Sequence, residues 1–555
     1  MSWVVFCGGA VYTMDPSMPW AQCVVVQGER IAFVGSEAEG RALAPRDAEV
    51  VDLAGGMLLP GFIDAHDHFA MMAVGKLGVD LSGIVGKDAI LAKVREYVAA
   101  NPGVAVYRGF GWYPGSFEGV SPRREWLDEI TGDVPMIVNS ADIHDLWFNT
   151  AAMKAAGVSA ATPDPEANQY FVRDADGTPT GHAVEGAAVT PILAAVGTFT
   201  PEVFRQAQEF TLAKAPSYGI TCYFEAGVFM GATSAASEPV YADYVARDLE
   251  GTLDVRVAGS YWTRSESDDP RQIAASLVDW NARLRSPHVS IAHCKMWADG
   301  TLFSDGALLL QPTCGAHPSV GQMTFSGEHI AAQIKAVQEA GFDMHIHVDA
   351  DGSARTVLDA YERVQQEIGR GDSRHAIAHN TLVAPEDLPR YAAMGILANC
   401  TPLWGTDYHG QYRQIYTDLL GAERVEERVF PYGDLVRSGA VVTFGADLPG
   451  VDLAEIPPLI QIEAAVTRKR PGYPDDSPFV ARQRMSLQDA LRAYTINGAY
   501  QLRMEHELGS IEVGKRADLV ALAQDLFAVA PEEIHAVPVR LTMMDGRVTF
   551  DSRAC

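Results

Sequence analysis

Eight short strand-like segments, separated by helix-like segments, are the feature of this 555-residue sequence that most restricts its fold. The short segments are rich in β-branched and apolar residues, and the longer ones carry alanine and leucine at helical spacing. The eight predicted strands are 61–63, 220–224, 255–260, 290–297, 343–348, 376–379, 395–399 and 441–444. Strands that alternate with helices form parallel sheets, and eight of them predict an α/β fold with a (β/α)₈ TIM barrel.

The two ends of the chain differ from this pattern and predict one separate β-domain. Residues 1–57 alternate short β-rich runs with turns, and residues 506–555 do the same around a tight turn at Asp545-Gly546. Neither end has enough strands to bury a sheet face alone. We therefore expect both termini to combine into a discontinuous β-sandwich domain.

One irregularity distorts the predicted barrel. About 150 residues separate His68 from Gly219, which is far more than one helix and its loops require. We assign residues 58–75 to the first barrel strand and a metal motif, 76–210 to a large insertion lobe over the barrel mouth, and 211–505 to the remainder of the barrel.

Charge and cysteine usage exclude several classes of partner. The chain has 43 Lys+Arg against 71 Asp+Glu, a net charge of −28, which repels nucleic acid and anionic membrane surfaces. Seven scattered cysteines without a C-x-x-C pair indicate neither a disulfide framework nor a thiolate zinc site. With no signal-peptide pattern and no long apolar run, we expect a cytoplasmic protein that acts on a small molecule, without nucleic-acid or membrane partners.

Two His-x-His pairs lie at the ends of predicted strands. His66 and His68 follow the first strand, and His345 and His347 lie in the fifth. Residues two apart on a strand point to the same face, so each pair brings two imidazoles together. A single pair of this kind is weak evidence, because short motifs also arise by chance.

The spacing of further polar residues strengthens the signal. His379 lies 32 residues after His347, about one βα unit, and Asp447 lies 68 residues after His379, about two units. These side chains then cluster at the carboxyl-terminal rim of the barrel, where such folds carry their active sites. The set predicts a metal site, and the alternative is a group of unrelated histidines in the core.

Several segments of the sequence resemble the signatures of a known protein family. Four segments, in this order along nearly the whole chain, resemble signatures of the amidohydrolase superfamily: 59–68, 374–379, 445–449 and 509–520. Two more, 133–149 and 295–300, are similar to amidohydrolase family 3, a branch that includes N-substituted formamide deformylases.

The resemblance implies a set of site residues. The metal ligands that it implies are His66, His68, Lys295, His347, His379 and Asp447. In such a site Lys295 is carboxylated by CO2 and bridges two metal ions, and Asp447 acts as general base and then general acid. The cations hold a bridging hydroxide that attacks the substrate. Imidazole and carboxylate ligands suit Zn²⁺, with Mn²⁺, Fe²⁺ and Co²⁺ left open, as is one ion or two.

The sequence indicates the residues that contact the substrate less directly than it indicates the metal ligands. Trp112, His144, Trp297 and Trp404 lie in lobe or rim segments and are predicted to wall a pocket for an apolar or aromatic group. The alternative is that the aromatic residues of the insertion form the lobe's own core.

Together these features predict a metal-dependent hydrolase of a C–N bond in a small amide, formamide, carbamate or cyclic amide. One alternative keeps the metal site but makes the chain an esterase, lactonase or decarboxylase. Another is a non-catalytic binding protein on the same fold, which would be marked by lost ligands, whereas all six positions are filled. By the same resemblance we expect a homodimer.

Overall fold

The structure is a computed structural model that describes residues 2–70, 77–117, 120–141, 145–165, 169–198, 200–228, 234–304, 306–315, 318–448, 450–451 and 453–553. The chain divides into two compact units. Unit 1 comprises Met1–Asp67, Leu212–Gly227 and Tyr244–Cys555, and unit 2 comprises His68–Thr211 and Val228–Asp243.

Unit 1 contains an eight-stranded parallel barrel whose strands follow one another in sequence order. Their bounds are β8 (Phe62–Asp67), β15 (Ile220–Glu225), β16 (Arg256–Thr263), β17 (Val289–Trp297), β18 (Asp343–Val348), β19 (Ala376–His379), β20 (Leu397–Cys400) and β21 (Val442–Phe444). The barrel nearly closes, because the backbone N–H of Asp447, just after β21, donates to the carbonyl of His66 in β8 at 2.9 Å. The predicted α/β fold with an eight-stranded barrel is confirmed.

All eight predicted strands are present, but some are longer than expected. β8 continues to Asp67 and β16 to Thr263, and both strands are buried along their whole length. The ends of both strands are buried rather than exposed to solvent. Sequence reasoning ended these strands where the apolar run stops, whereas the ladder of backbone hydrogen bonds continues through the polar residues.

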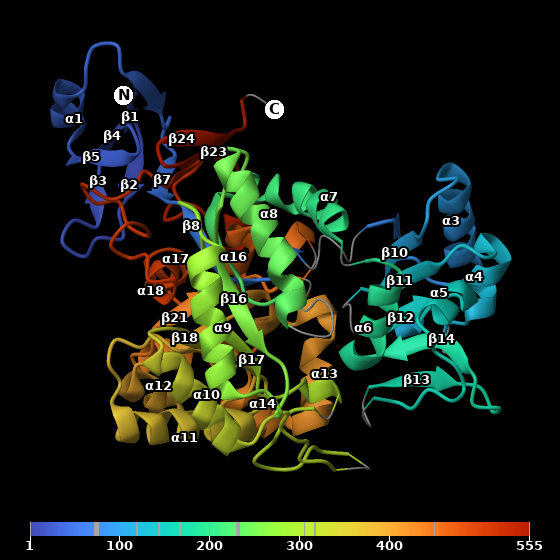
Figure 1. Ribbon diagram of the computed structural model, residues 1–555. Coiled ribbons are helices and arrows are strands. Elements are labelled where there is room, and N and C mark those ends of the chain that lie inside the picture. Colours follow the sequence, from blue (N-terminus) through green and yellow to red (C-terminus); the bar gives the residue numbers. More distant parts are fainter. Residues whose placement is uncertain are drawn as a thin grey trace. The chain divides into compact units, whose positions relative to one another are not determined.

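Helices and short 3-10 turns lie between the strands, as Figure 1 shows for unit 1. The helices that follow β16 to β21 are α9 (Pro270–Arg283), α10 (Gly327–Glu339), α11 (Asp351–Ile368), α12 (Leu388–Met394), α13 (Tyr412–Leu420), α14 (Ala422–Arg428), α15 (Tyr432–Arg437), α16 (Pro458–Thr467), α17 (Leu487–Ala493) and α18 (Ile496–Gln501). Side-chain caps fix their starts: Asp269 accepts from the N–H of Arg271 at α9, and Ser326 accepts from His329 at α10.

The chain ends in unit 1 form two further sheets. One has the order β5-β4-β1-β6 and the other β24-β23-β22-β7-β2-β3. Their bounds are β1 (Trp3–Cys7), β2 (Ala10–Tyr12), β3 (Trp20–Ala21), β4 (Cys23–Gln27), β5 (Arg30–Gly35), β6 (Glu49–Asp52), β7 (Met57–Pro60), β22 (Leu519–Leu522), β23 (Val539–Met544) and β24 (Arg547–Asp551). The short helix α1 (Glu37–Leu43) follows β5.

Segments from both termini share one core. β7 pairs antiparallel with β22, with Leu59 opposite Val520, and strands from the two ends of the chain lie side by side in Figure 1. Phe6 and Val24 of one sheet pack in the same apolar cluster as Leu519 and Met543 of the other. Because β7 belongs to this β-domain, the boundary predicted at residue 58 falls inside one of its strands.

Unit 2 has its own sheet, with the order β13-β14-β12-β11-β10-β9. The bounds are β9 (Val79–Asp80), β10 (Tyr107–Trp112), β11 (Met136–Ser140), β12 (Asp145–Phe148), β13 (Tyr170–Arg173) and β14 (Pro179–Val184), with helices α3 (Lys87–Ala100), α4 (Arg124–Thr131), α5 (Thr150–Ala155) and α6 (Gly186–Ala195). The helix α7 (Pro201–Leu212) belongs to this unit up to Thr211, and the helix α8 (Glu238–Leu249) belongs to it up to Asp243. In the described part of the chain, no helix is long and apolar enough to cross a membrane.

Candidate metal centre

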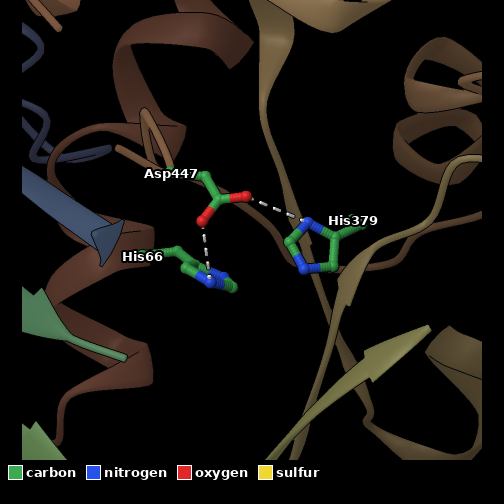
Figure 2. A group of neighbouring side chains, drawn as sticks. All are labelled: His66, His379 and Asp447. Carbon is green, nitrogen blue, oxygen red and sulfur yellow. Dashed lines mark ion pairs between the residues drawn. The ribbon is translucent and has the colours of Figure 1, made fainter. Parts of the chain in front are cut away.

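Three side chains converge at the carboxyl-terminal rim of the barrel (Figure 2). His66 comes from β8, His379 is the last residue of β19, and Asp447 follows β21. All three are buried, and one ligand atom of each lies within 4.8 Å of the others. Parallel strands end at the same rim, so residues far apart in the sequence meet there.

The Asp447 carboxylate lies between the two imidazoles (Figure 2). Its Oδ1 is 3.4 Å from His66 Nε2, and its Oδ2 is 3.6 Å from His379 Nδ1. Both separations exceed the usual hydrogen-bond length, as expected for ligand atoms that face a common centre. Imidazole nitrogen and carboxylate oxygen in a buried site are the donors that divalent cations such as Zn²⁺ prefer, so these residues fit a metal ion.

The backbone is strained at two of the three residues. His379 has φ of 73° and Asp447 has φ of 55°, the left-handed region that side chains other than glycine rarely adopt. Such residues cost about 1–3 kcal/mol each and persist only where their surroundings fix them. Asn380 does so beside His379, because its amide donates to the carbonyls of Ile377 and Asn399 at 2.9 Å.

Lys295 lies against the same group. It is fully buried at the end of β17, and its Nζ is 3.2 Å from His66 Nε2. Loss of solvent lowers the pKa of Lys295 to about 7, an effect that the charge of Asp447 partly opposes. The Lys295 ammonium group therefore loses its proton readily and becomes a neutral amine.

Two residues that sequence reasoning did not assign hold His66. The Asp64 carboxylate accepts from the backbone N–H groups of His66 at 3.1 Å and Ala446 at 3.0 Å. Burial raises the pKa of Asp64 to about 8, against the lowering effect of these two hydrogen bonds. His345 is also buried, with its Nε2 3.0 Å from His66 Nδ1. The His-x-His spacing gave a signal for His345, but the ligand set implied by the resemblance used only His347.

The remaining predicted ligands lie differently. The His347 ring is 4.3 Å from the His379 ring, centre to centre, but its Nε2 faces the Gly300 carbonyl at 3.2 Å, outside the group of three. His68 is buried and is the first residue of unit 2.

Two of the predicted substrate contacts adjoin the site histidines. Trp404 stacks on the His379 ring at 5.5 Å, and its Nε1 donates to the carbonyl of Gly450. Trp297 lies 5.8 Å from the His347 ring. Both tryptophans are half-buried.

The other two predicted contacts are Trp112 and His144. Trp112 is fully buried in an apolar core of unit 2, where its Nε1 donates to the carbonyl of Val138 at 2.9 Å. Its prediction as a pocket wall is corrected, since an aromatic pattern alone does not separate core from pocket. His144 lies outside the described residues.

The eight-stranded barrel and the buried histidine and aspartate side chains at its carboxyl-terminal rim together define a metal-dependent hydrolase. The sequence profile of the amidohydrolase family matches residues 49–550. The chain therefore belongs to the amidohydrolase family and is an enzyme that hydrolyses carbon–nitrogen bonds other than peptide bonds, which confirms the resemblance seen in the sequence.

Similar proteins agree with this assignment. The chain is 27% identical to the putative amidohydrolase YtcJ of Bacillus subtilis, over 99% of both chains. It is 28% identical to an N-substituted formamide deformylase of Arthrobacter pascens, over 98% of this chain and 97% of that one. Its fold matches an uncharacterized metal-dependent hydrolase from Pyrococcus horikoshii with a TM-score of 0.75 and 20% identity, over 96% of this chain and 99% of that one.

Proposed function

We propose that this enzyme cleaves the C–N bond of a small amide, formamide, carbamate or cyclic amide that carries an apolar or aromatic group. The observation that carries the proposal is the buried group of His66, His379 and Asp447 beside Lys295. The 28% identity to an N-substituted formamide deformylase along nearly the whole chain supports formamides as the first substrates to test.

The residues that would hold the metal are the three of this group together with Lys295, His347 and His68. When bound, a divalent cation such as Zn²⁺ polarises the substrate carbonyl and makes water a nucleophile at neutral pH. Lys295, as a neutral amine, would react with CO2: a new N–C bond would form, one proton would leave, and the resulting carbamate would supply two oxygen atoms as metal ligands. Its burial and low pKa support this step.

Asp447 would move the proton. Its carboxylate lies between His66 and His379 at the carboxyl-terminal rim of the barrel. It takes a proton from the attacking water as the C–O bond forms. It then gives that proton to the amine nitrogen as the C–N bond breaks, so an amide or formamide yields a carboxylic acid and an amine.

Trp404 and Trp297 would bind the apolar part of the substrate. Each is half-buried and lies against one site histidine, Trp404 on His379 and Trp297 on His347. Flat aromatic side chains at this position favour a planar or apolar substituent next to the scissile bond.

Measurements of metal content and of substrate range together test this proposal. Protein purified without chelator, and protein resupplied with Zn²⁺ and bicarbonate, should hold about two metal ions per chain. Lys295→Ala should lose metal clearly, whereas Lys335→Ala, a half-exposed lysine paired with Glu367, should not.

An N-arylalkyl formamide should then be hydrolysed faster than the matching ester and lactone. Turnover of the ester or lactone alone would favour the esterase or lactonase alternative. Absence of bound metal in the parent, even after resupply, would overturn the proposal and favour a binding protein.

We further propose a cytoplasmic location and a homodimer. Six cysteines in the described part of the chain are free thiols, five of them buried, which supports a reducing compartment. The dimer rests on the tendency of proteins of this fold to pair, and light scattering of the purified enzyme tests it.

A further inference from the structure

Two buried aspartates join the loops that follow β17 and β18. Asp299 lies two residues after β17, and its carboxylate accepts from the backbone N–H of Asp349 at 3.0 and 3.1 Å and of Ala350 at 3.2 Å. Asp349 directly follows β18, and its Oδ2 accepts from the N–H of Leu302 at 2.7 Å. Each loop therefore supplies a carboxylate to the backbone of the other.

The His347 ring lies against the first of these loops. Its Nε2 is 3.2 Å from the carbonyl oxygen of Gly300 and 3.6 Å from Oδ1 of Asp299. The Gly300 carbonyl can only accept, so the contact at 3.2 Å places the hydrogen of the imidazole on Nε2. The lone pair of the neutral imidazole then resides on Nδ1, the nitrogen that remains for a metal.

The hydrogen bonds that join the two loops do not by themselves explain why position 299 is an aspartate. The backbone donors of Asp349 and Ala350 need an acceptor, which an uncharged side-chain oxygen also provides. The aspartate in addition places a carboxyl oxygen beside the N–H edge of His347, in a position that is 1% exposed. In metal sites, a carboxylate or carbonyl on the far nitrogen of a ligating histidine fixes its tautomer, fixes its ring orientation and makes it a stronger donor.

We propose that Asp299, together with the Gly300 carbonyl, is the positioning element of His347: it holds the ring with hydrogen on Nε2 so that Nδ1 binds the metal. Asp299 does not touch the metal or the substrate. The inference rests on the proposed metal-dependent function and adds to it a residue outside the ligand set.

Asp299→Asn and Asp349→Asn form a matched pair of variants. The chemical change is the same, and both variants alter the carboxylates that join the same two loops. Of these two aspartates, it is Asp299 whose carboxylate lies beside the His347 ring. Metal-free parent and variants are titrated with Zn²⁺ against a chelating indicator, and the visible absorption of the Co²⁺-loaded proteins is recorded.

We expect Asp299→Asn to bind zinc about 10- to 100-fold more weakly than the parent and to change the Co²⁺ spectrum, because ligand orientation is altered. Asp349→Asn should keep the affinity and the spectrum of the parent. If Asp299→Asn keeps the zinc affinity and Co²⁺ spectrum of the parent, or if both variants lose affinity equally, the proposal is overturned. Asp299 would then serve only to join the two loops. A parent that binds no zinc would instead refute the proposed function itself.

Gly300→Ala keeps the proposal testable if Asp299→Asn does not fold. A Cβ at this glycine would meet the backbone of Gly306 at 3.2–3.4 Å, so the turn must shift by a few tenths of an ångström and carry the carbonyl with it. We expect the same spectral change as in Asp299→Asn, to a smaller extent. A parent-like spectrum in this variant would contradict the inference.

Discussion

The side-chain oxygen of Asn399, on β20, lies 3.0 Å from Nδ1 of His66. The orientation of this amide is fixed, because its nitrogen donates to the carbonyl of Ala65 and to the hydroxyl of Thr443. Asn399 therefore favours the hydrogen of His66 on Nδ1, where Nε2 of His345 also lies at 3.0 Å, and the lone pair on Nε2, on the side of Asp447.

Asn399→Ala should weaken both the fold and the metal site. Loss of a buried acceptor costs about 1–3 kcal/mol, which lowers the thermal midpoint of the metal-free protein. His66 is then free to change tautomer, so zinc affinity in the chelator titration also falls. The control is Asn281→Ala, which removes a hydrogen bond to the Ile291 carbonyl without touching His66. An equal drop in zinc affinity in both variants would contradict this role of Asn399.

Trp404 should report metal binding by fluorescence. Its ring stacks on His379 at 5.5 Å, and Co²⁺ quenches indoles close to it. We expect Co²⁺ to quench part of the tryptophan emission of the parent and to quench clearly less in Trp404→Phe. Trp20→Phe is the control, because Trp20 packs on Tyr12 and Phe527 of the β-domain. Undiminished quenching in Trp404→Phe would place the metal away from His379.

A buried ion pair links the barrel to the β-domain. Arg256 at the start of β16 binds Asp518 through two hydrogen bonds of 3.0 and 3.2 Å, and both side chains are 4% exposed. Asp518→Asn leaves the arginine charge with less compensation, which we expect to cost about 3 kcal/mol, since breaking buried pairs is strongly destabilising. Asp551→Asn, whose partner Arg553 is 63% exposed, should change the unfolding midpoint little. Similar midpoints for the two variants would refute this prediction.

His288 should make stability depend on pH. Its Nδ1 lies 2.5 Å from Asp248 and its Nε2 2.6 Å from Asp545. The hydrogen bond to Asp545 raises the pKa of His288, against the effect of burial, and the bond to Asp248 raises it further. The other charged groups around it are Arg256 and Arg516, which both bind Asp545.

The sign of this effect follows from proton binding. A histidine whose pKa is higher in the folded state stabilises the fold fully below its unfolded pKa of about 6.5, and the stabilisation is lost as pH rises through the folded pKa. His288→Gln should therefore lower the thermal midpoint more at pH 6 than at pH 8.5. His506→Gln, at a side chain that is 89% exposed, is the control. A difference between parent and His288→Gln that does not vary with pH would exclude the ion pairs as its cause.

The barrel was predictable because its strands are buried on both faces. Such strands are usually continuous apolar runs. β18 and β19 were located to the residue, although β18 alternates apolar residues with Asp343, His345 and His347. The regular spacing of βα units also placed His379 and Asp447 at one rim, where the structure brings them next to His66. Local pattern and repeat length are properties that a sequence displays directly.

Contacts across the barrel were not predictable in this way. Asn399 contacts His66 over a large sequence distance, and Asp64 joins the backbone N–H of His66 to that of the distant Ala446. No spacing rule marks either contact. The left-handed backbone of His379 and Asp447 is also invisible in the sequence, since neither is a residue type that signals it strongly. Trp112 shows a third limit, because aromatic residues that form a core and aromatic residues that line a pocket give the same sequence pattern.

The pairing of β7 with β22 has a consequence for synthesis on the ribosome. β7 is fully buried and ends one residue before β8, whose neighbour Gly61 also donates to the carbonyl of Asp518 at 2.8 Å. These partners emerge hundreds of residues after β7, later than every residue of the metal centre. Until then the nascent chain carries an apolar strand edge that can pair with other chains. Protection by chaperones thus matters most during translation of the barrel, and ends when the carboxyl-terminal strands arrive.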